Sequence, residues 1–365
     1  LAKHHAGEER LDDARRMIAL LDMARDSEDE KSRADAERLV RNLLTIEKGQ
    51  DGPVPLERYY ALLMMDGDHM GEILSGGGRA AISFLESFHT QVRQGFSERS
   101  IGSPALAAYA MEKRPPSPAR HMMISAALND FSQVVVPHVV EEEFAGRLIY
   151  AGGDDVLAML PVRDVLAAMQ RLRDVYSGLA RDDQNVDLLN FNKRDQLVVN
   201  AGFAVLNGRL MRMMGPRATA SCGVVVAHHM APLSFVLREL RKAERRAKDH
   251  LRAVLGENGR PKPVNRDAFN ITVVKRSGGT LYLSAAWGEP LRLLIDLRNF
   301  LASAEVSRRA VYNTLEWLAH LPQSGGQLDQ EMLETLLAYQ FSRQSEGEAK
   351  KKAPDLAERL AKLAA

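Results

Sequence analysis

The chain has 365 residues, of which 45% are hydrophobic and 27% charged, with 49 lysines and arginines against 48 acidic residues. A chain of this length buries sizeable cores in two or three domains, and a net charge near zero favours neither a nucleic-acid-binding nor a strongly acidic protein. Its single cysteine, Cys222, excludes internal disulfides and cysteine-rich zinc sites, and its apolar neighbours predict a small buried side chain rather than a reactive thiol.

No apolar run reaches membrane-spanning length and no secretory pattern stands at the N-terminus, so we expect a cytoplasmic protein without membrane contact. The first residue, Leu1, indicates a piece of a longer polypeptide. Residues 1–50 are charged with apolar residues at helical spacing, which predicts a helical lead-in. The segment 51–55, Asp-Gly-Pro-Val-Pro, then punctuates the chain and predicts the start of a new domain.

The apolar run 59–65 has the length of a strand and ends at Asp66. A glycine-rich loop is predicted at 75–78, then a helix over 80–96. The proline-rich stretch 99–120 predicts irregular structure. A further helix is expected over 122–136, where Pro137 kinks or ends it.

Two apolar strands, 144–150 and 156–160, flank Gly152-Gly153-Asp154-Asp155 and predict a hairpin with these residues at its tip. A helix is expected over 165–179 and another strand over 218–227. The order βαββαβ predicts an α+β, ferredoxin-like palm domain over residues 51–285, flanked by helical regions.

Helical spacing then predicts a long helix over 234–255, and a glycine-containing turn predicts a hairpin of strands 269–274 and 280–283. Residues 286–365 predict a C-terminal helical domain. Its expected parts are helices at 291–301, 307–321 and 330–341, a charged hinge at 345–353 and a helical tail from Asp355.

The carboxylates of Asp66, Asp154 and Asp155 stand where strands end, and such hard oxygen ligands suit Mg²⁺. Gly152 and Gly153 permit a tight turn and the close approach of a triphosphate. Gly-Gly-Asp-Asp alone would more often be a polar hairpin turn. The flanking strands, the earlier Asp-Gly-Asp and the element order favour a metal site instead.

Four further residues are candidates for nucleotide contacts. Gly67 lies between the two acids of the first strand end, and Asp68 would ligate metal or, as we favour, cap the following turn. Lys248 would reach a triphosphate or remain one of several solvated bases. Ser125 would touch a base or ribose, although a serine within a helix more often faces solvent.

Histidines and arginines add weaker candidates. His228 and His229 follow the strand 218–227, and hydrogen bonding is favoured over metal ligation because magnesium prefers oxygen. Arg209, Arg212 and Arg217 form the densest basic set before that strand. They would contact an RNA duplex through phosphates, but solvent exposure is the expected state.

Taken together, segments 59–71, 125–131, 150–158 and 218–233 resemble, in order, motifs of the large subunit of type III CRISPR effector complexes, specifically the Cmr (type III-B) branch. The resemblance implies a palm of the polymerase and nucleotide-cyclase type. It also implies a nucleotidyltransferase that uses Mg²⁺ or Mn²⁺ and joins ATP into cyclic oligoadenylates when target RNA binds. Other protein subunits, guide RNA and target RNA are the implied partners.

Carried over residue by residue, Asp66, Asp154 and Asp155 become the metal-binding acids, and Gly152 and Gly153 the turn that admits the nucleotide. The sequence lacks the His-Asp dipeptide of the nuclease domain that family members commonly carry, and no segment before residue 51 is long enough for their second, degenerate palm. We therefore expect this chain alone to be weakly active or inactive.

Three alternatives remain open. A diguanylate-cyclase-like enzyme shares such a palm, but its hairpin usually ends in Glu-Phe where this chain has Asp155-Val156. A templated polymerase would need fingers and thumb regions that are not evident. A non-catalytic scaffold that contacts RNA and partner subunits would not need the three acids.

Overall fold

A computed structural model describes Lys31 and Ala34 and most of the chain from residue 58 onward. The chain divides into two compact units, residues 1–60 and 61–365, and the second holds the elements discussed below apart from the first two residues of its first strand. The predicted helical lead-in lies almost entirely outside the described residues. The described ranges are 58–78, 81–100, 103–180, 195–255, 260–307, 309–318 and 329–364.

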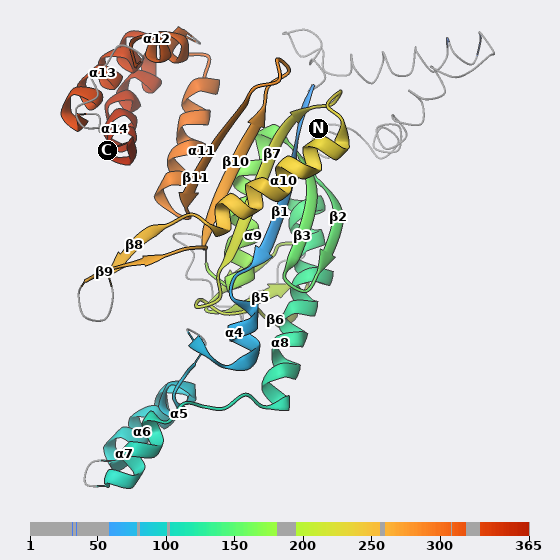
Figure 1. Ribbon diagram of the computed structural model, residues 1–365, viewed down its shortest axis with the longest axis vertical. Coiled ribbons are helices and arrows are strands. Elements are labelled where there is room, and N and C mark those ends of the chain that lie inside the picture. Colours follow the sequence, from blue (N-terminus) through green and yellow to red (C-terminus); the bar gives the residue numbers. More distant parts are fainter. Residues whose placement is uncertain are drawn as a thin grey trace. The chain divides into compact units, whose positions relative to one another are not determined.

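A six-stranded sheet forms the centre of the second unit, with the strand order β11-β10-β7-β1-β3-β2 (Figure 1). Four neighbouring strands on one side of this sheet, β7-β1-β3-β2, come in the chain order β1, β2, β3, β7, with helix α8 between the first two and helix α9 between the last two. This arrangement confirms the predicted ferredoxin-like α+β fold. The bounds are β1 Tyr59–Gly67, α8 Pro118–Asp130, β2 Arg147–Gly152, β3 Asp155–Pro161, α9 Val162–Ser177, β7 Ala220–His228, β10 Ala268–Val274 and β11 Thr280–Ala286.

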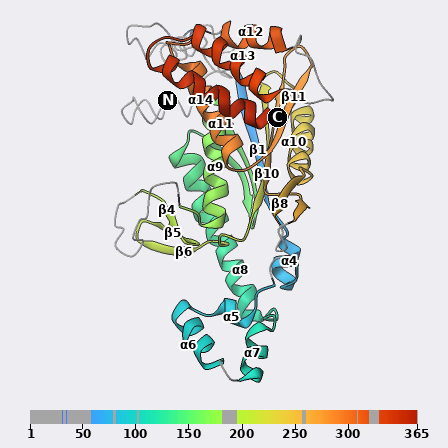
Figure 2. The same ribbon diagram turned by 90° about the vertical axis from the view of Figure 1, so that its left-hand side faces the viewer.

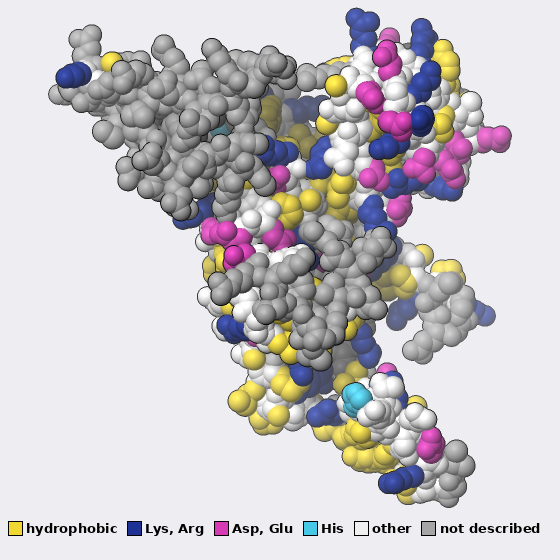
Figure 3. Space-filling view, turned by 180° about the vertical axis from the view of Figure 1, so that it is seen from behind, with side chains coloured by type: hydrophobic (Ala, Val, Ile, Leu, Met, Phe, Trp, Pro, Cys, Tyr) yellow, Lys and Arg dark blue, Asp and Glu magenta, His cyan; other side chains and the backbone are white. Residues whose placement is uncertain are grey.

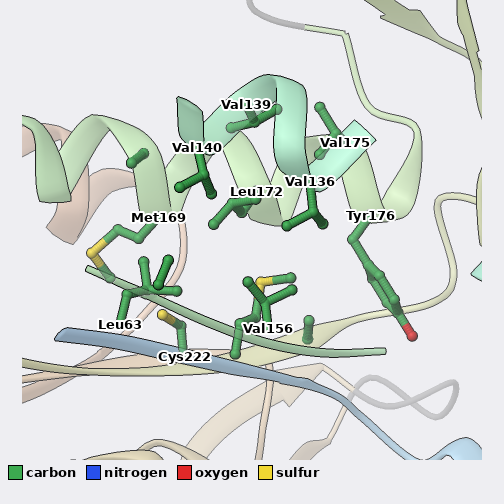
Figure 4. Close-up of a cluster of buried hydrophobic side chains, with 14 of the residues drawn as sticks. Leu63, Val136, Val139, Val140, Val156, Met169, Leu172, Val175, Tyr176 and Cys222 are labelled. Atoms are coloured by element: carbon green, nitrogen blue, oxygen red, sulfur yellow. The ribbon is translucent and has the colours of Figure 1, made fainter. Parts of the chain in front are cut away.

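Helices cover both faces of the sheet, and strand β7 shows why. Successive residues of a strand point to opposite faces. Cys222 packs into the core with α9, whereas the neighbouring Gly223 faces the backbone of α10, Leu233–Lys248. The core on the α9 side joins strand residues to two helical segments (Figure 4). It includes Leu63, Val156 and Cys222 from strands, and Val136, Val139, Val140, Met169, Leu172, Val175 and Tyr176 from helices.

The structure overturns the irregular structure predicted for 99–120 and, of the two effects predicted for Pro137, the ending of the helix. The stretch 99–120 is largely helical, because Pro104 and Pro118 occupy the first turn of their helices, where the missing N–H removes no helical hydrogen bond. Pro137 does not end its helix, which continues through Glu143 in π-helical turns on either side. The wider turn relieves the clash between a proline ring and the preceding carbonyls.

The glycine-rich loop predicted at 75–78 follows a short helix that was not predicted, and the helix predicted after it is interrupted. Residues 70–75 form a helix, which Gly76 ends in a left-handed conformation with φ of 68°. The helix predicted over 80–96 is broken at Phe88, and Ser83 begins its first part through a capping box with Glu86. The helices here are α4 Met70–Ser75, α5 Phe84–Ser87, α6 Thr90–Ser100 and α7 Pro104–Met111.

The long helix predicted over 234–255 ends early, at Lys248. Arg252 donates hydrogen bonds to the backbone oxygen of Asp267 at 2.6 Å and to its carboxylate at 2.9 Å, so the chain turns away and residues 252–255 form a strand. The predicted hairpin β10–β11 is confirmed, and it extends the central sheet through parallel pairing with β7. Two small sheets were not predicted: β4 Val198–Asn200 with β5 Phe203–Leu206 and β6 Arg209–Arg212, and β8 Arg252–Leu255 with β9 Pro261–Val264.

The C-terminal part is helical, as expected, and has its own core. Helices α13 and α14 lie side by side (Figure 2). The predicted charged hinge at 345–353 is wrong, because α14 begins at Gly347 and buries Ala349 and Ala353 in that core. The domain limits proposed at residues 50 and 285 stay predictions. The helices are α11 Glu289–Ala302, α12 Arg309–Leu318, α13 Gln330–Arg343 and α14 Gly347–Ala364.

Candidate active site

The Gly-Gly-Asp-Asp segment forms the predicted hairpin tip. Strands β2 and β3 pair antiparallel with Gly152 opposite Asp155, which leaves Gly153 and Asp154 as the turn. Gly153 has φ of 62°, in the left-handed region that other residues rarely adopt. A Cβ there would meet no atom within 4 Å, so the backbone conformation, rather than space, accounts for this glycine.

The end of β1 lies against this turn. The backbone N–H of Gly67 donates a hydrogen bond to the Asp154 carboxylate. A Cβ on Gly67 would lie only 2.7 Å from Asp154 Oδ2 and 2.8 Å from Asp154 Cβ. Gly67 is therefore the residue that lets the two segments meet, and the predicted convergence of the two strand ends occurs.

The acids of the two segments perturb one another. Burial, a hydrogen bond with Asp66, and the charges of Asp66 and Asp154 raise the pKa of Asp155 to about 6. Burial and the Asp66 charge also raise the pKa of Asp154. Carboxylates this close repel one another when they are ionised. A bound cation would offset that repulsion, so the site favours a cation.

Lys248 supplies one positive charge to this cluster. From the last turn of α10 its Nζ forms an ion pair with Asp66 Oδ2 and another with Glu244 Oε1 at 2.5 Å. Burial lowers the pKa of Lys248, but hydrogen bonds to both carboxylates outweigh burial and raise it overall. Lys248 is therefore not one of the solvated bases on α10. Its other predicted role, contact with a triphosphate, stays a prediction.

Asp68 is bonded to residues outside the acid cluster, and its predicted capping role is wrong. Its carboxylate accepts hydrogen bonds from Thr219 Oγ1 at 2.8 Å, Ser221 Oγ at 2.7 Å and the backbone N–H of Asp267 at 2.9 Å. It is 1% exposed, and the helix that follows has His69 as N-cap without a side-chain cap. Its hydrogen bonds tie β1 to β7 and β10, so the role that we assign to it is structural.

A cavity of about 500 Å³ adjoins the hairpin tip. Ser125 lines this cavity together with Gly152 and Gly153, so the structure brings the serine on α8 to the turn, as the nucleotide-contact prediction requires. The cavity also has apolar and amide-bearing walls. The other lining residues are Leu74, His121, Ile124, Leu128, Asn129, Ser132 and Gln133.

Sequence reasoning missed two residues of the site. Tyr176 is buried, its hydroxyl lies 3.4 Å from Met70 Sδ, and burial and the charge of Asp154 raise its pKa. Its position in the sequence signals only a core residue of a helix. Glu244 orients Lys248, and its spacing of four residues from that lysine was an available signal.

The remaining candidates have protein contacts. His228 Nδ1 accepts a hydrogen bond from the backbone N–H of Met230 at 3.2 Å, which supports hydrogen bonding over metal ligation. Cys222 is buried in the core, as predicted. Each of the three arginines has a different contact: Arg209 pairs with Asp130 at 2.5 Å, Arg212 lies 5.7 Å from the Phe203 ring centroid and Arg217 pairs with Glu86 at 3.8 Å.

The donor chemistry fits a hard divalent ion, although the side chains are not spread around one. In the part of the chain that the structure describes, no group of at least three His, Cys, Asp or Glu side chains is arranged to hold a metal. Asp155 instead forms a side-chain hydrogen bond with Asp66, and the ammonium of Lys248 forms an ion pair with Asp66. Carboxylate oxygens suit magnesium or manganese, and such an ion would take the place of the Lys248 ammonium beside Asp66.

The family described as Cas10/Cmr2, second palm domain, matches residues 59–255, which is more than half of the chain. The chain belongs to the Cas10/Cmr2 family. The match covers β1, the hairpin and β7, and it confirms the family that the sequence motifs predicted.

This Cas10/Cmr2 chain is similar to two curated Cmr2 subunits. It is 29% identical over 308 residues to the CRISPR system Cmr subunit Cmr2 of Pyrococcus furiosus, covering 83% of this chain and 28% of that protein. It is 28% identical over 187 residues to the Cmr2 subunit of Saccharolobus solfataricus, covering 51% of this chain and 16% of that protein. The chain thus spans less than a third of the length of either relative.

Solved structures agree on the fold. A chain of the type III-B Cmr-beta complex bound to cognate target RNA matches with a TM-score of 0.58 and 18% identity, over 87% of this chain and 37% of that one. The apo state of Cmr-beta matches with a TM-score of 0.57 and 18% identity, over 88% of this chain and 36% of that one.

Among the described residues no helix has the length and apolarity needed to cross a bilayer.

Proposed function

We propose that this chain is the catalytic palm of a type III-B CRISPR RNA-guided effector complex, and that it synthesises cyclic oligoadenylates from ATP when target RNA binds. The observation that carries the proposal is the meeting of Asp66 with Asp154 and Asp155 beside a cavity, at the strand ends of a Cas10/Cmr2 palm. Burial and neighbouring charges raise the pKa values of Asp154 and Asp155, and such shifts are typical of functional sites.

In this proposal Asp66, Asp154 and Asp155 hold Mg²⁺ or Mn²⁺. When bound, such an ion neutralises charge that develops on the phosphates during nucleotidyl transfer. The chain's contribution is to fix the carboxylates. Gly67 holds the Asp154 carboxylate through its N–H, and Lys248 is paired with Asp66 until another cation takes its place.

The cavity at the hairpin tip is the proposed position of the ATP that is attacked. Gly152 and Gly153 place bare backbone beside it, Ser125 offers a hydroxyl to the base or ribose, and Lys248, once released from Asp66, is free to pair with phosphate. A 3′-hydroxyl oxygen attacks the α-phosphorus, the bond to pyrophosphate breaks, and the hydroxyl proton is lost to water.

The proposed partners are the other protein subunits of a Cmr-type complex, with guide RNA and target RNA contacted mainly through them. One relative is named as a subunit of a Cmr system, and one similar structure as a complex bound to cognate target RNA. Because the chain spans only 28% of the first relative, the rest of the polypeptide is expected to complete the pocket.

The test uses the full-length polypeptide that contains this chain, assembled in its effector complex with guide RNA. The complex is given ATP, Mg²⁺ or Mn²⁺ and cognate target RNA, and the products are identified by mass. We expect cyclic oligoadenylate that is lost in the double variant Asp154→Ala and Asp155→Ala. The matched control is Asp164→Ala together with Asp174→Ala, which removes two acids from α9.

Other products would contradict the proposal in distinct ways. Cyclic di-GMP from GTP would indicate a diguanylate-cyclase-like enzyme, and long polymer a polymerase. No product from a complex that still binds target RNA would indicate a scaffold.

A further inference from the structure

A second cavity, of about 390 Å³, lies on another side of α8 from the catalytic one. Of the residues on α8, Ile124 lines both cavities, but Ser125 and Leu128 face only the first and Met123 and Ala127 only the second. The walls of the second cavity come from α4, α8 and the segment between β6 and β7. Its volume is within the range of small-molecule sites.

Arginines from separate parts of the chain line this cavity: Arg114, Arg120, Arg212 and Arg217. Within the described ranges, the side chains of Arg114 and Arg212 form no ion pair with a carboxylate. Arg212 instead lies over the Phe203 ring and its Nη1 is 3.8 Å from Met123 Sδ. Such a cluster is expected to attract an anion, and arginine suits phosphate because its planar fork donates paired hydrogen bonds.

The rest of the lining is apolar and adaptable. Basic and hydrophobic side chains also lie next to one another on the lower part of the face drawn in Figure 3. Methionine side chains are flexible and polarisable, so they adapt to a flat ring. The apolar lining residues are Ile73, Ile82, Ala119, Met123, Ile124, Ala127, Met213, Met214 and Ala218.

His69 adds an unused polar group to the same cavity. It has φ of 57°, a left-handed conformation that is uncommon for a residue with a side chain. Its Nδ1 lies 3.4 Å from Glu72 Oε1, while its Nε2 is buried without a hydrogen-bond partner. A buried polar atom without a partner is costly, and a ligand that bonds to it would recover that cost.

We propose that this cavity binds a mononucleotide, separately from the site of nucleotidyl transfer. The arginines would pair with its phosphate, the methionines and isoleucines would cover its base, and His69 with Glu72 would hydrogen-bond to its polar edge. Inorganic phosphate would leave the apolar lining exposed, and a purely apolar ligand would leave the arginines without an anion.

The cavity also adjoins the catalytic strand end. Asp68 and Thr219 line it, and they are joined by the 2.8 Å hydrogen bond that ties β1 to β7. Asp66 lies two residues before Asp68. A nucleotide in this cavity would therefore lie next to the chain segment that carries the first proposed catalytic acid, Asp66.

The test is a calorimetric titration of the full chain with AMP in the presence of EDTA. Chelation removes metal from the proposed catalytic site, so binding in EDTA does not depend on the proposed function. We expect the double variant Arg114→Glu and Arg212→Glu to bind AMP at least about tenfold more weakly, because each charge-assisted hydrogen bond is worth that much. The matched control Arg276→Glu reverses an exposed arginine in the β10–β11 turn and should bind as the wild type does.

A steric variant gives a second measure. Ala119→Trp places a large ring on an exposed position of the lining and should block AMP while the thermal unfolding midpoint stays unchanged. Unaltered AMP affinity in both the charge and the steric variants would overturn the proposal. So would inorganic phosphate binding as tightly as AMP, or the linear dinucleotide pApA binding more tightly than AMP.

Discussion

Replacing Gly67 with alanine tests the geometry of the acid cluster most directly. Its φ is not in the left-handed region, so an alanine is not strained by its backbone, and the effect is purely one of space. The new Cβ would lie 2.7 Å from Asp154 Oδ2, whereas ordinary contact begins at 3.4 Å, so this oxygen must move by about 0.7 Å. The Tyr176 hydroxyl would also be displaced.

Two magnitudes follow from this displacement. Overpacking of this kind costs about 1–3 kcal/mol of unfolding free energy. Octahedral Mg²⁺ or Mn²⁺ sites tolerate little displacement, and a misplacement near 1 Å at reacting groups costs on the order of a hundredfold in rate. We therefore expect Gly67→Ala to remain folded but to bind Mn²⁺ at least about tenfold more weakly than the wild type.

Free Mn²⁺ measured by electron paramagnetic resonance gives the affinity, and urea denaturation gives the stability. The matched control is Gly71→Ala, on the exposed surface of α4, where a new Cβ meets no atom within 4 Å. This variant should bind Mn²⁺ as the wild type does, and its free energy of unfolding should rise by up to about 0.5–1 kcal/mol. Wild-type Mn²⁺ affinity in a folded Gly67→Ala chain would refute the reasoning, as would an equal loss in both variants.

Three further substitutions follow from the electrostatics and hydrogen bonds. Lys248→Met removes a charge that lowers the pKa of Asp155, so that pKa should rise above about 6 in a carboxyl ¹³C NMR titration, and an unchanged value would contradict the assigned contact. Because the folded pKa of Asp155 lies above its ordinary 3.8, ionisation destabilises the fold as pH rises through about 6. Asp155→Asn should therefore leave stability unchanged below pH ~4 and raise it by about 1 kcal/mol at pH ~8, after allowance for solvent screening of an exposed side chain. Asp68→Ala leaves three donors without their acceptor and should cost about 3 kcal/mol in urea denaturation, with a smaller loss of Mn²⁺ affinity than Asp154→Ala causes.

The parts of the fold that depend on local signals were predictable. Two short apolar runs on either side of the glycines at 152 and 153 specify a hairpin whichever elements surround it, and the order of strands and helices then leaves few topologies. The errors arose where packing overrides local preference. Pro137 and the segment 347–353 lie in helices because their neighbours are buried in a core, and no local signal reports that burial.

The candidate site shows the same division. The acids were visible as a motif, but the role of Asp68 was not, because its partners Thr219, Ser221 and Asp267 lie 151, 153 and 199 residues further along the chain. Spacing alone could not separate a ligand from a buried acceptor. Tyr176 gave no signal, since a tyrosine on the apolar face of a helix is an ordinary core residue.

The positive charge of the site depends on packing at a distance from it. A Cβ on Gly223 would lie 2.7 Å from the backbone of Ala243 and Glu244, so this glycine lets α10 approach β7 closely. Glu244 and Lys248 are one helical turn apart, and the position of the helix therefore fixes where the ammonium meets Asp66. In the proposed function a divalent ion would compete with that ammonium for the same carboxylate, so we expect binding of the ion and release of Lys248 toward phosphate to be a single exchange.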